Sequence, residues 1–562
     1  MRNAPVLTPP RRLTGRADVY CATAGAVLVA AAFLYPRILS EPARGRLYAG
    51  AAPIFGNWLP HIGWGTAPAI GVAALVISYG PTLARQLPWR RALALTWLTA
   101  IAWAFALAMV DGWQRGFAGR LTTRDEYLHE VGGVHDIAAM LRGFSGRILD
   151  FQPNSWTTHV SGHPPGALLS FVLLDRIGLG GGAWAATLCL LVGTSAVVAI
   201  PVAIRALGSA DLDDGAGVAR HGAATGDQPR WFSRFAGSSG AAPEFTDIAE
   251  QRARAALPFL ALAPAAIWIA VSADALFAGV TAWAVALLAI ATRGQRHWVA
   301  TGLAAGLLFG FGIFLSYGLV LMAVAAAFVL AARTFRPAIP ALIGVLLVVA
   351  AFKAAGFWWL DGYHLVVQRY YQGIASERPY SYWVWANLGG TVCALGLAPV
   401  AALARVARGI APNMPGPASA ADSAAQLAPA AVAPAHPDAG SAFDGEAAVS
   451  DREGVVALSA PHDGGGMNPG GPAARYSALL NAVRNWRGAV DPAALVAAAG
   501  LAALLLADLS GLSKAETERI WLPFTVWVIA GAGLLPARWG RVWLGVQAVG
   551  ALVLVHFILT NW

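Results

Sequence analysis

The stretch Thr157–Leu169 reads TTHVSGHPPGALL and places two histidines and two consecutive prolines directly ahead of an apolar run. Pro164 fixes its own φ and biases His163 away from helical geometry, whereas Pro165 suits the first turn of a helix. We therefore expect a helix to begin rigidly at the prolines. Whether the apolar run Gly166–Leu174 crosses a membrane sets the orientation of every later segment.

The composition indicates a membrane protein. Of 562 residues, 57% are hydrophobic and only 12% are charged, and 22 are tryptophan. Soluble proteins carry about a quarter charged residues, and abundant Trp is typical of chains with aromatic side chains at both membrane interfaces. The net charge of +9 is then read as an orientation signal, so we expect membrane lipids and no nucleic acid as partners. Cys21, Cys189 and Cys393 lie in apolar segments and predict neither disulfides nor a zinc site.

A bilayer-crossing helix needs about 20 apolar residues. The sequence contains about 13 stretches near or somewhat below that length, which predicts an all-α integral membrane protein. The expected spans are Tyr20–Pro36, Thr66–Ala84, Ala92–Val110, Ala183–Ile204, Ala255–Val271, Ala275–Ala291, Trp298–Phe314, Tyr317–Ala332, Ala338–Ala355, Trp383–Leu403, Pro492–Leu506, Leu522–Leu535 and Val542–Leu559.

The arginines fix a predicted orientation, because cytoplasmic loops are enriched in Lys and Arg. With the N-terminus in the cytoplasm, nearly every cytoplasmic junction is basic. If Gly166–Leu174 were a full span, every later loop would change side and the pattern would fail. We therefore expect a helix lying at the outer interface there, in a multi-pass protein of the plasma membrane. The basic residues are Arg2, Arg11, Arg12, Arg16, Arg85, Arg90, Arg91, Arg205, Arg252, Arg254, Arg293, Arg296, Arg333, Arg336, Arg405, Arg408, Arg538 and Arg541.

The chain divides into six segments. Two are poor in large apolar residues and rich in Ala, Gly, Pro, Asp and Ser, which predicts disordered cytoplasmic linkers. The segments are an N-terminal cytoplasmic tail with two spans (1–91), a core with an outer acidic loop at 111–182 (92–206), a linker (207–251), further core spans (252–408), a linker (409–480) and C-terminal spans (481–562).

Polar chemistry gathers in the outer loops. The longest that is not low-complexity, Asp111–Gly166, contains the acidic pair Asp125–Glu126 and four histidines. Its segment DEYLHEVGGVHDIAAML has a helical period and predicts one amphipathic helix along the membrane surface. The spans themselves hold almost no charge, which argues against an ion-coupled transporter. Other outer segments contribute Asp274 in VSADALF, Arg369 and Arg378 in DGYHLVVQRYYQGIASERPYSYW, and Lys514 and Arg519 in LSGLSKAETERIW.

The order of these features resembles a known superfamily. An outer Asp125–Glu126 pair is followed by HPPG, an apolar interfacial helix, a basic inner turn and an acid at the next outer mouth in SADALF. This order resembles the GT-C glycosyltransferases of the protein O-mannosyltransferase and lipid A aminoarabinose transferase type, over roughly residues 92–332. The chain departs from that pattern in having two spans before the acidic loop, Gly166 in place of a bulky residue, and two long linkers.

The resemblance implies a GT-C-like fold with outer juxtamembrane helices and an inverting glycosyltransferase that uses a polyprenyl-phosphate sugar donor. The acceptor would be a glycan, a lipid or a protein, and a divalent cation is the one cofactor that the resemblance allows. It implies Asp125 as the base, with Glu126 and Asp274 helping in positioning or metal binding. Substrate-binding candidates are Tyr127, His159, His163, Arg369, Arg378, Lys514 and Arg519.

Other interpretations stay open at this stage. The acidic pair can be a solvated first helical turn, Asp274 can cap the helix that follows it, and the cations can be interfacial anchors. His159 and His163 stand four residues apart, which allows a zinc-dependent hydrolase, although Gly162 and Pro164 disfavour a regular helix across them. A transporter or flippase of a lipid-linked substrate, and a lipid-binding scaffold without turnover, are the remaining alternatives.

Overall fold

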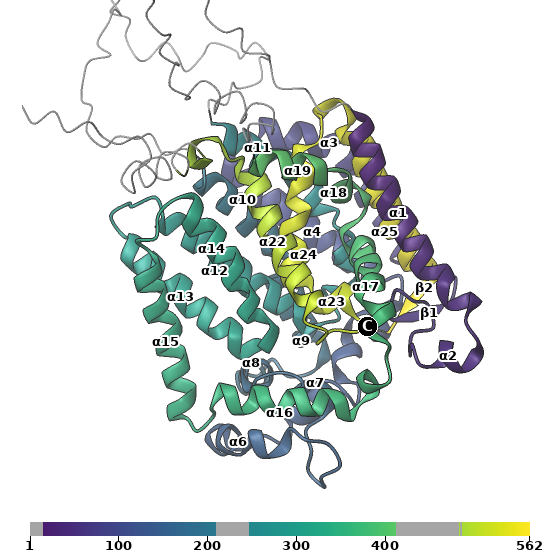
Figure 1. Cartoon of the computed structure of the whole chain (residues 1–562), viewed down its shortest axis with the longest axis vertical. Coiled ribbons are helices and arrows are strands. Elements are labelled where there is room, and N and C mark those ends of the chain that lie inside the picture. The colour runs from purple at the N-terminus through teal and green to yellow at the C-terminus, as the bar shows by residue number, and fades with distance from the viewer. Residues whose placement is uncertain (1–14, 209–246, 412–482, 484–485, 562) are drawn as a thin grey trace, which may run out of the picture. The chain divides into compact units, whose positions relative to one another are not determined.

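The computed structural model describes residues 15–208, 247–411, 483 and 486–561. This part of the chain is mostly helical (Figure 1). The elements discussed below belong to one compact unit formed by Met1–Ile410 and Val490–Trp562. The predicted tail up to residue 14, and most of the predicted linkers 207–251 and 409–480, lie outside the described residues.

Within the described residues, eight helices are long and apolar enough to cross a membrane. Each covers one of the expected spans, so an all-α chain with several membrane-spanning helices is confirmed, whereas the count of about 13 is not. The eight are α1 (Gly15–Ile38), α3 (Thr66–Gln86), α4 (Trp89–Ala108), α9 (Gly182–Thr194) joined to α10 (Ala196–Ala206), α12 (Ala273–Ala291), α13 (Trp298–Leu315), α22 (Pro492–Leu509), and η9 (Ala537–Trp539) joined to α25 (Gly540–Phe557).

The other five expected spans are shorter or broken. The clearest break follows α15 (Ala338–Ala354), which bends by 77° into α16 (Trp359–Gln372). Gly356 has a φ of +99° at this bend, a conformation that suits only glycine. The remaining four are α11 (Ile248–Ala261) with η5 (Pro264–Trp268), η6 (Tyr317–Leu321) with α14 (Met322–Ala332), α17 (Tyr380–Leu395) with α18 (Leu397–Ala401), and α24 (Leu522–Ile529) with η8 (Ala530–Leu534).

The proline pair behaves as predicted. The short helix α7 (Thr158–Ser161) ends at Gly162, and α8 (Pro165–Arg176) begins at the second proline. With 12 residues, α8 is about 18 Å long, well short of a hydrocarbon core of about 30 Å. A Cβ atom on Gly166 would lie 2.5 Å from the carbonyl oxygen of Phe314 in α13. Glycine therefore stands here because α8 approaches the backbone of α13 too closely for any side chain.

The two ends of the helices differ in charge. At one end, which we call the basic end, arginines form contacts between separate loops. These arginines are predicted to lie on one side of the membrane. Figure 1 shows α10, α11 and α19 (Leu403–Ile410) ending there, whereas α6 (Ile137–Gly143), α7, α8 and α16 lie at the opposite, acidic-loop end. The linking contacts run from Arg254 to the carbonyls of Ala84 and Leu87, from Arg333 to Gly208, from Arg541 to Ser78, from Arg252 to Asp491 and from Arg405 to Asp18.

The acidic loop contains short elements instead of the single amphipathic helix that was expected, so that expectation is wrong. Gly132 and Gly133 end α5 (Leu128–Val131), and Asp136 caps α6 through the amides of Ala138 and Ala139. The other short elements at this end are η1 (Gln114–Ala118), η2 (Arg120–Thr122), η3 (Ser145–Arg147), η7 (Ile374–Ser376) and α23 (Thr517–Ile520). Elsewhere, α2 (Glu41–Gly45) is short, and β1 (Gly56–Trp58) pairs antiparallel with β2 (Ile558–Thr560).

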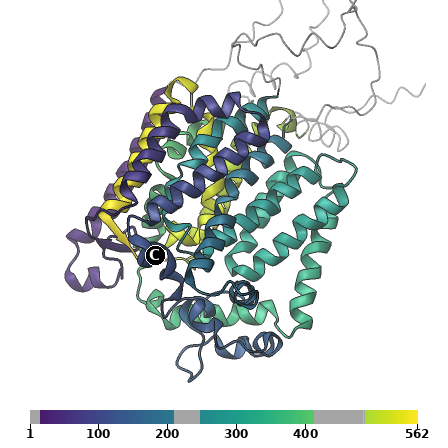
Figure 2. The same cartoon turned by 180° about the vertical axis from the view of Figure 1, so that it is seen from behind.

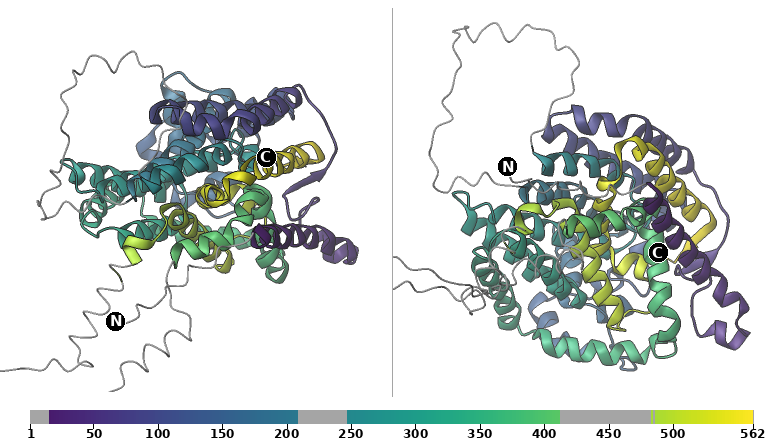
Figure 3. Two further views of the ribbon diagram at one scale, coloured as in Figure 1. Left: turned by 90° about the horizontal axis from the view of Figure 1, so that it is seen from above. Right: turned by 45° about the horizontal axis from the view of Figure 1, so that its top comes forward.

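Helix α12 is the most buried of the eight and contacts α9, α10, α13 and α24. Its contact with α9 depends on glycine: a Cβ on Gly279 would lie 2.1 Å from the carbonyl oxygen of Val192, and one on Gly193 would lie 2.8 Å from Ala275 Cβ. Figure 2 shows α3 beside α4 on the face turned away in Figure 1, and Figure 3 shows α1 at the periphery, where it contacts α17 and α18. Helix α12 also contacts α23, one of the short elements at the acidic-loop end.

Candidate functional site

Asp274 lies in the first turn of α12, and Ser272, not Asp274, caps the N-terminus of this helix. Ser272 is the N-cap: its Oγ accepts from the Asp274 amide at 3.1 Å and donates to Asp274 Oδ2 at 2.6 Å. The alternative in which Asp274 itself caps the helix is therefore wrong. Asp274 is 3% exposed, and a carboxylate buried to that degree needs a charged partner.

Arg519 of α23 is that partner. Its Nη1 lies 2.6 Å from Asp274 Oδ2, and its Nη2 lies 2.9 Å from Glu516 Oε2. Burial alone would lower the pKa of Arg519, but the carboxylates of Asp274, Glu516 and Glu126 outweigh burial and raise it. Arg519 is therefore a permanent buried cation surrounded by acids.

Glu126 is buried close to the same guanidinium group. Burial raises the pKa of Glu126 to about 7, although Arg519 and Arg120 act in the opposite direction. Its Oε1 lies 3.6 Å from His159 Nε2. Burial likewise lowers the pKa of Arg120 to about 10, with Glu126 opposing that shift. Near neutral pH, Glu126 therefore exists as a mixture of acid and carboxylate.

Of the two histidines of the HPP stretch, buried His159 lies beside Glu126, and the rings of buried Tyr127 and half-buried His163 lie close by. His163 Nδ1 lies 2.8 Å from the carbonyl oxygen of His159 and must carry the proton, because a carbonyl only accepts. The Tyr127 ring lies 6.2 Å from the His159 ring and 5.8 Å from the His163 ring. Burial lowers the pKa of both histidines, so both are neutral at pH 7 and line the site without adding charge.

Asp125 differs sharply from its neighbour because its side chain is exposed. The hydroxyl of Thr158 donates to Asp125 Oδ1 at 3.3 Å, and the amide of His159 donates to the Asp125 carbonyl at 3.0 Å. Both contacts come from α7 and hold the acidic pair against it. A solvent-accessible carboxylate thus stands next to a buried one.

Two of the remaining predicted cations join the same network. Arg378, 4% exposed, donates from Nη1 to the Lys514 carbonyl at 2.7 Å and to Glu516 Oε1 at 3.3 Å, and from Nη2 to the Tyr48 carbonyl at 3.2 Å. The Lys514 ammonium donates to the Ala375 carbonyl at 2.9 Å. Glu516 therefore connects Arg378 to Arg519.

Arg369 lies apart from these groups. It pairs with Asp150 and donates from Nε to Ser161 Oγ of α7 at 3.2 Å. The structure thus brings six predicted residues into what we call the buried charge cluster, with Asp125 at its exposed edge and Arg378 and Lys514 attached through Glu516. The six are Glu126, Tyr127, His159, His163, Asp274 and Arg519.

Three side chains that contact or lie close to the cluster were not among the predicted site residues: Arg120, Ser272 and Glu516. Glu516 stands three residues before Arg519, a spacing that favours an ion pair within one helical turn, and Ser272 stands where an N-cap is expected before an apolar helix. Those two signals were available. No sequence signal indicated Arg120, because its proximity to Glu126 depends on the fold.

A pocket of about 200 Å³ adjoins the buried charge cluster. It lies between α5, α8 and the Gly-rich turn before α9, and its wall includes Phe171, whose ring lies 5.3 Å from that of Tyr127. Leu128, Val131 and Leu174 make the lining largely apolar, and Asp175 lies at its edge. Such a space suits part of an amphiphilic ligand.

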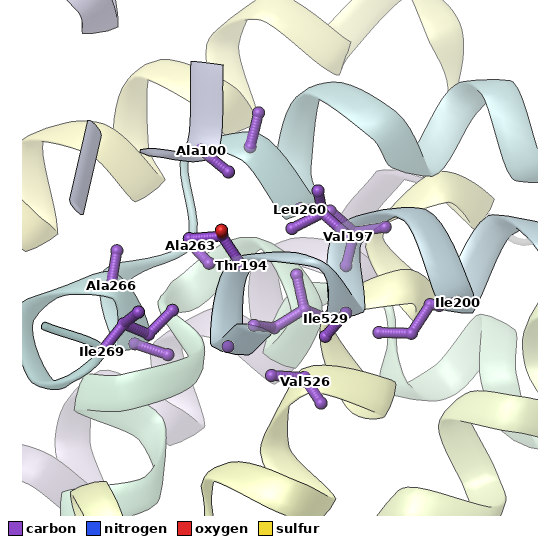
Figure 4. Close-up of a pocket in the computed structure, with 14 residues that line it drawn as sticks. Ala100, Thr194, Val197, Ile200, Leu260, Ala263, Ala266, Ile269, Val526 and Ile529 are labelled. Carbon is purple, nitrogen blue, oxygen red and sulfur yellow. The ribbon is translucent and has the colours of Figure 1, made fainter. Parts of the chain in front are cut away.

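A second cavity is a packing gap (Figure 4). It measures about 20 Å³ and is lined by small and aliphatic side chains with Thr194 among them. The Thr194 hydroxyl donates to the Leu190 carbonyl at 2.6 Å and accepts from Trp97 at 3.0 Å. Its polar group is therefore already paired, and the gap carries no chemistry.

Among residues 15–208, 247–411 and 486–561, no group of three or more His, Cys, Asp or Glu side chains is placed to bind a metal ion. Comparison of the chain with models of known protein families, with curated proteins and with solved structures gives no match. The function must therefore be inferred from the site.

Proposed function

We propose that the protein is an inverting glycosyltransferase that takes a sugar from a polyprenyl phosphate at the outer face of the plasma membrane. The observation that supports this most strongly is the pairing of an exposed carboxylate, Asp125, with a buried cation network headed by Arg519 at one end of a bundle of membrane-spanning helices. A base and a phosphate-binding cation are the two groups that such a transfer requires.

The chemistry follows from the leaving group. A phosphate departs with its bonding electrons and needs no proton, so the transfer requires only charge stabilisation on that side. On the other side, a carboxylate removes the proton from the acceptor hydroxyl as its oxygen attacks the anomeric carbon. One bond forms as the sugar–phosphate bond breaks on the opposite face, and the configuration inverts.

The three acids divide these tasks by exposure. Asp125 is open to an acceptor arriving from outside the membrane and serves as the base. Glu126 and Asp274 are 3% exposed each and hold Arg519, with Arg120, toward the donor phosphate. The guanidinium groups of Arg378 and Arg519 and the ammonium of Lys514 supply the charge that the phosphate needs.

The residues present do not fit a divalent cation between the acids. Asp274 Oδ2 is occupied by Arg519 at 2.6 Å and by Ser272 at 2.6 Å. The Arg519 guanidinium thus takes the position that a metal ion would need.

The test is transfer by the purified protein from a panel of polyprenyl-phosphate sugars to glycan, lipid and protein acceptors. We expect Asp125→Asn to lose about 10²–10⁴-fold in rate, the usual contribution of a general base. Asp136→Asn is the matched control, because it lies in the same loop and asparagine also caps helices well.

Full transfer by folded Asp125→Asn would refute the assignment of the base. Uptake of a lipid-linked sugar into vesicles without any transfer product would favour the transporter or flippase. Sugar release that depends on added zinc would favour the hydrolase.

A further inference from the structure

Glu516 lies between two buried arginines, and each of its carboxylate oxygens contacts one of them. Oε1 lies 3.3 Å from Arg378 Nη1, and Oε2 lies 2.9 Å from Arg519 Nη2. The side chains of Arg378 and Arg519 are 4% and 6% exposed, whereas that of Glu516 is 21% exposed. The carboxylate therefore covers the two cations on the side that solvent can reach.

The two arginines do not depend on Glu516 for their positions. Arg519 is held from α12 by Asp274 through its other terminal nitrogen. Arg378 donates to the backbone carbonyls of Lys514 and Tyr48. If the Glu516 carboxylate moved away, both guanidinium groups would remain in place, oriented toward the position it had left.

Arg378 has a donor that Glu516 does not use. The Nε–H of Arg378 is buried and, within the described part of the chain, has no hydrogen-bond partner. A buried donor without a partner is unfavourable, and the Glu516 carboxylate contacts Arg378 at Nη1 and leaves Nε unserved. A phosphate presents more acceptor oxygens and matches two guanidinium groups well.

Resting on the proposed function, we propose that Glu516 is an internal placeholder for the phosphate of the donor. The phosphate displaces the Glu516 carboxylate from Arg378 and Arg519, and the carboxylate moves outward into solvent. Without a ligand, Glu516 neutralises cations whose burial would otherwise be costly. With a ligand, Asp274 keeps Arg519 aimed at the phosphate.

The backbone at Glu516 is strained. Ala515 and Glu516 have φ angles of +71° and +64°, which are unfavourable for residues with a Cβ atom. Two such residues in succession are kept only where the surroundings enforce them. The contacts of Glu516 with the two arginines are part of that enforcement, so their loss favours a change of backbone conformation here.

The test compares anion binding by the full-length purified protein and its Glu516→Gln variant. Removing an acid that competes with the ligand should tighten binding of polyprenyl phosphate at least tenfold. Glu377→Gln is the matched control: Glu377 is exposed at the same end and contacts Tyr48, and its loss changes the net charge equally. We expect Glu377→Gln to bind within twofold of the wild type.

Stability separates the placeholder from a purely structural ion pair. Glu516→Gln should unfold at a lower temperature than the wild type, and saturating polyprenyl phosphate should raise that temperature by more in the variant than in the wild type. Glu516→Asp, which keeps the charge but has a shorter reach, should show the same gain if Glu516→Gln folds poorly. Unchanged or weaker binding by both variants, or an equal gain by Glu377→Gln, would overturn the proposal.

Two further arms separate this inference from the proposed function. Inorganic phosphate that gains affinity in parallel with polyprenyl phosphate would support the placeholder and assign recognition to the phosphate group alone. Tighter phosphate binding by Glu516→Gln without sugar transfer from any donor would support the placeholder while refuting the glycosyltransferase. Transfer by the wild type with unchanged donor affinity in Glu516→Gln would refute the placeholder alone.

Discussion

Replacing Asp274 with asparagine tests the centre of the site. The change removes the buried negative charge that faces Arg519 at 2.6 Å, in a pair whose side chains are 4% and 6% exposed, while it keeps the side-chain shape. Loss of one partner from a buried ion pair costs about 3–5 kcal/mol. Asparagine still accepts from Ser272, and Glu516 still faces Arg519, so we expect about 3 kcal/mol, the lower end of that range.

Denaturant titration of the detergent-solubilised protein measures this loss, and about 3 kcal/mol corresponds to more than a hundredfold in the unfolding equilibrium. Asp18→Asn is the matched control, since Asp18 is 2% exposed and pairs with Arg405 at 2.7 and 2.8 Å at the basic end. Both variants should lose similar stability, but only Asp274→Asn should lose sugar transfer under conditions in which both are folded.

Wild-type stability in Asp274→Asn would refute the reasoning, because it would mean that Arg519 does not need this charge. Equal loss of transfer in Asp18→Asn would refute the link between the cluster and activity.

Three further predictions concern pH, packing and metal ions. Burial raises the pKa of Glu126 to about 7 from 4.5, so between these pH values the folded state keeps a proton that the unfolded state loses. The free energy of unfolding should therefore fall by about 3 kcal/mol as pH rises from about 4.5 to about 7. Unfolding of the Glu126→Gln variant, measured at pH 5 and pH 8, should lack this contribution. Gly166→Ala should destabilise the protein by about 1–3 kcal/mol through its clash with Phe314, whereas Gly143→Ala, with nothing within 4 Å, should be neutral or stabilising in the same titration. A chelator should leave transfer unchanged, since Arg519 occupies the position of a metal ion, and a loss restored by Mg²⁺ would contradict this.

The grouping of loops by side was predictable because it depends on counting. The arginines that define the basic loops are spread along the whole chain. Because Lys and Arg are enriched in the cytoplasmic loops of membrane proteins, these loops are predicted to lie on one side. The contacts of Arg254 with Ala84 and Leu87, and of Arg405 with Asp18, show that these loops do meet at one end. Counting needs no knowledge of packing, so it grouped these loops without a structure, and the side of the membrane that they face stays a prediction.

The internal composition of the site was not predictable in the same way. Asp274 and Arg519 are 245 residues apart, and nothing local to either one names its partner. The acidic loop was expected to hold one helix, but two glycines outweighed its helical period. Two of the expected spans that proved broken have proline or glycine at the break, Pro264 and Gly396, and a count of apolar residues does not detect such breaks.

The adjacent acids Asp125 and Glu126 show why residue type and spacing leave the roles undecided. They are equivalent in sequence, yet one is exposed and the other is 3% exposed. Burial, together with the charges of Asp274 and Asp125, raises the pKa of Glu126 to about 7, which leaves it partly protonated at neutral pH. A base that receives protons from an incoming acceptor has to exchange them with solvent, which favours Asp125. A carboxyl group that orients buried arginines has to stay out of solvent, which favours Glu126. The roles that we propose for the two therefore depend on α7, which contacts the exposed Asp125 and places His159 against Glu126.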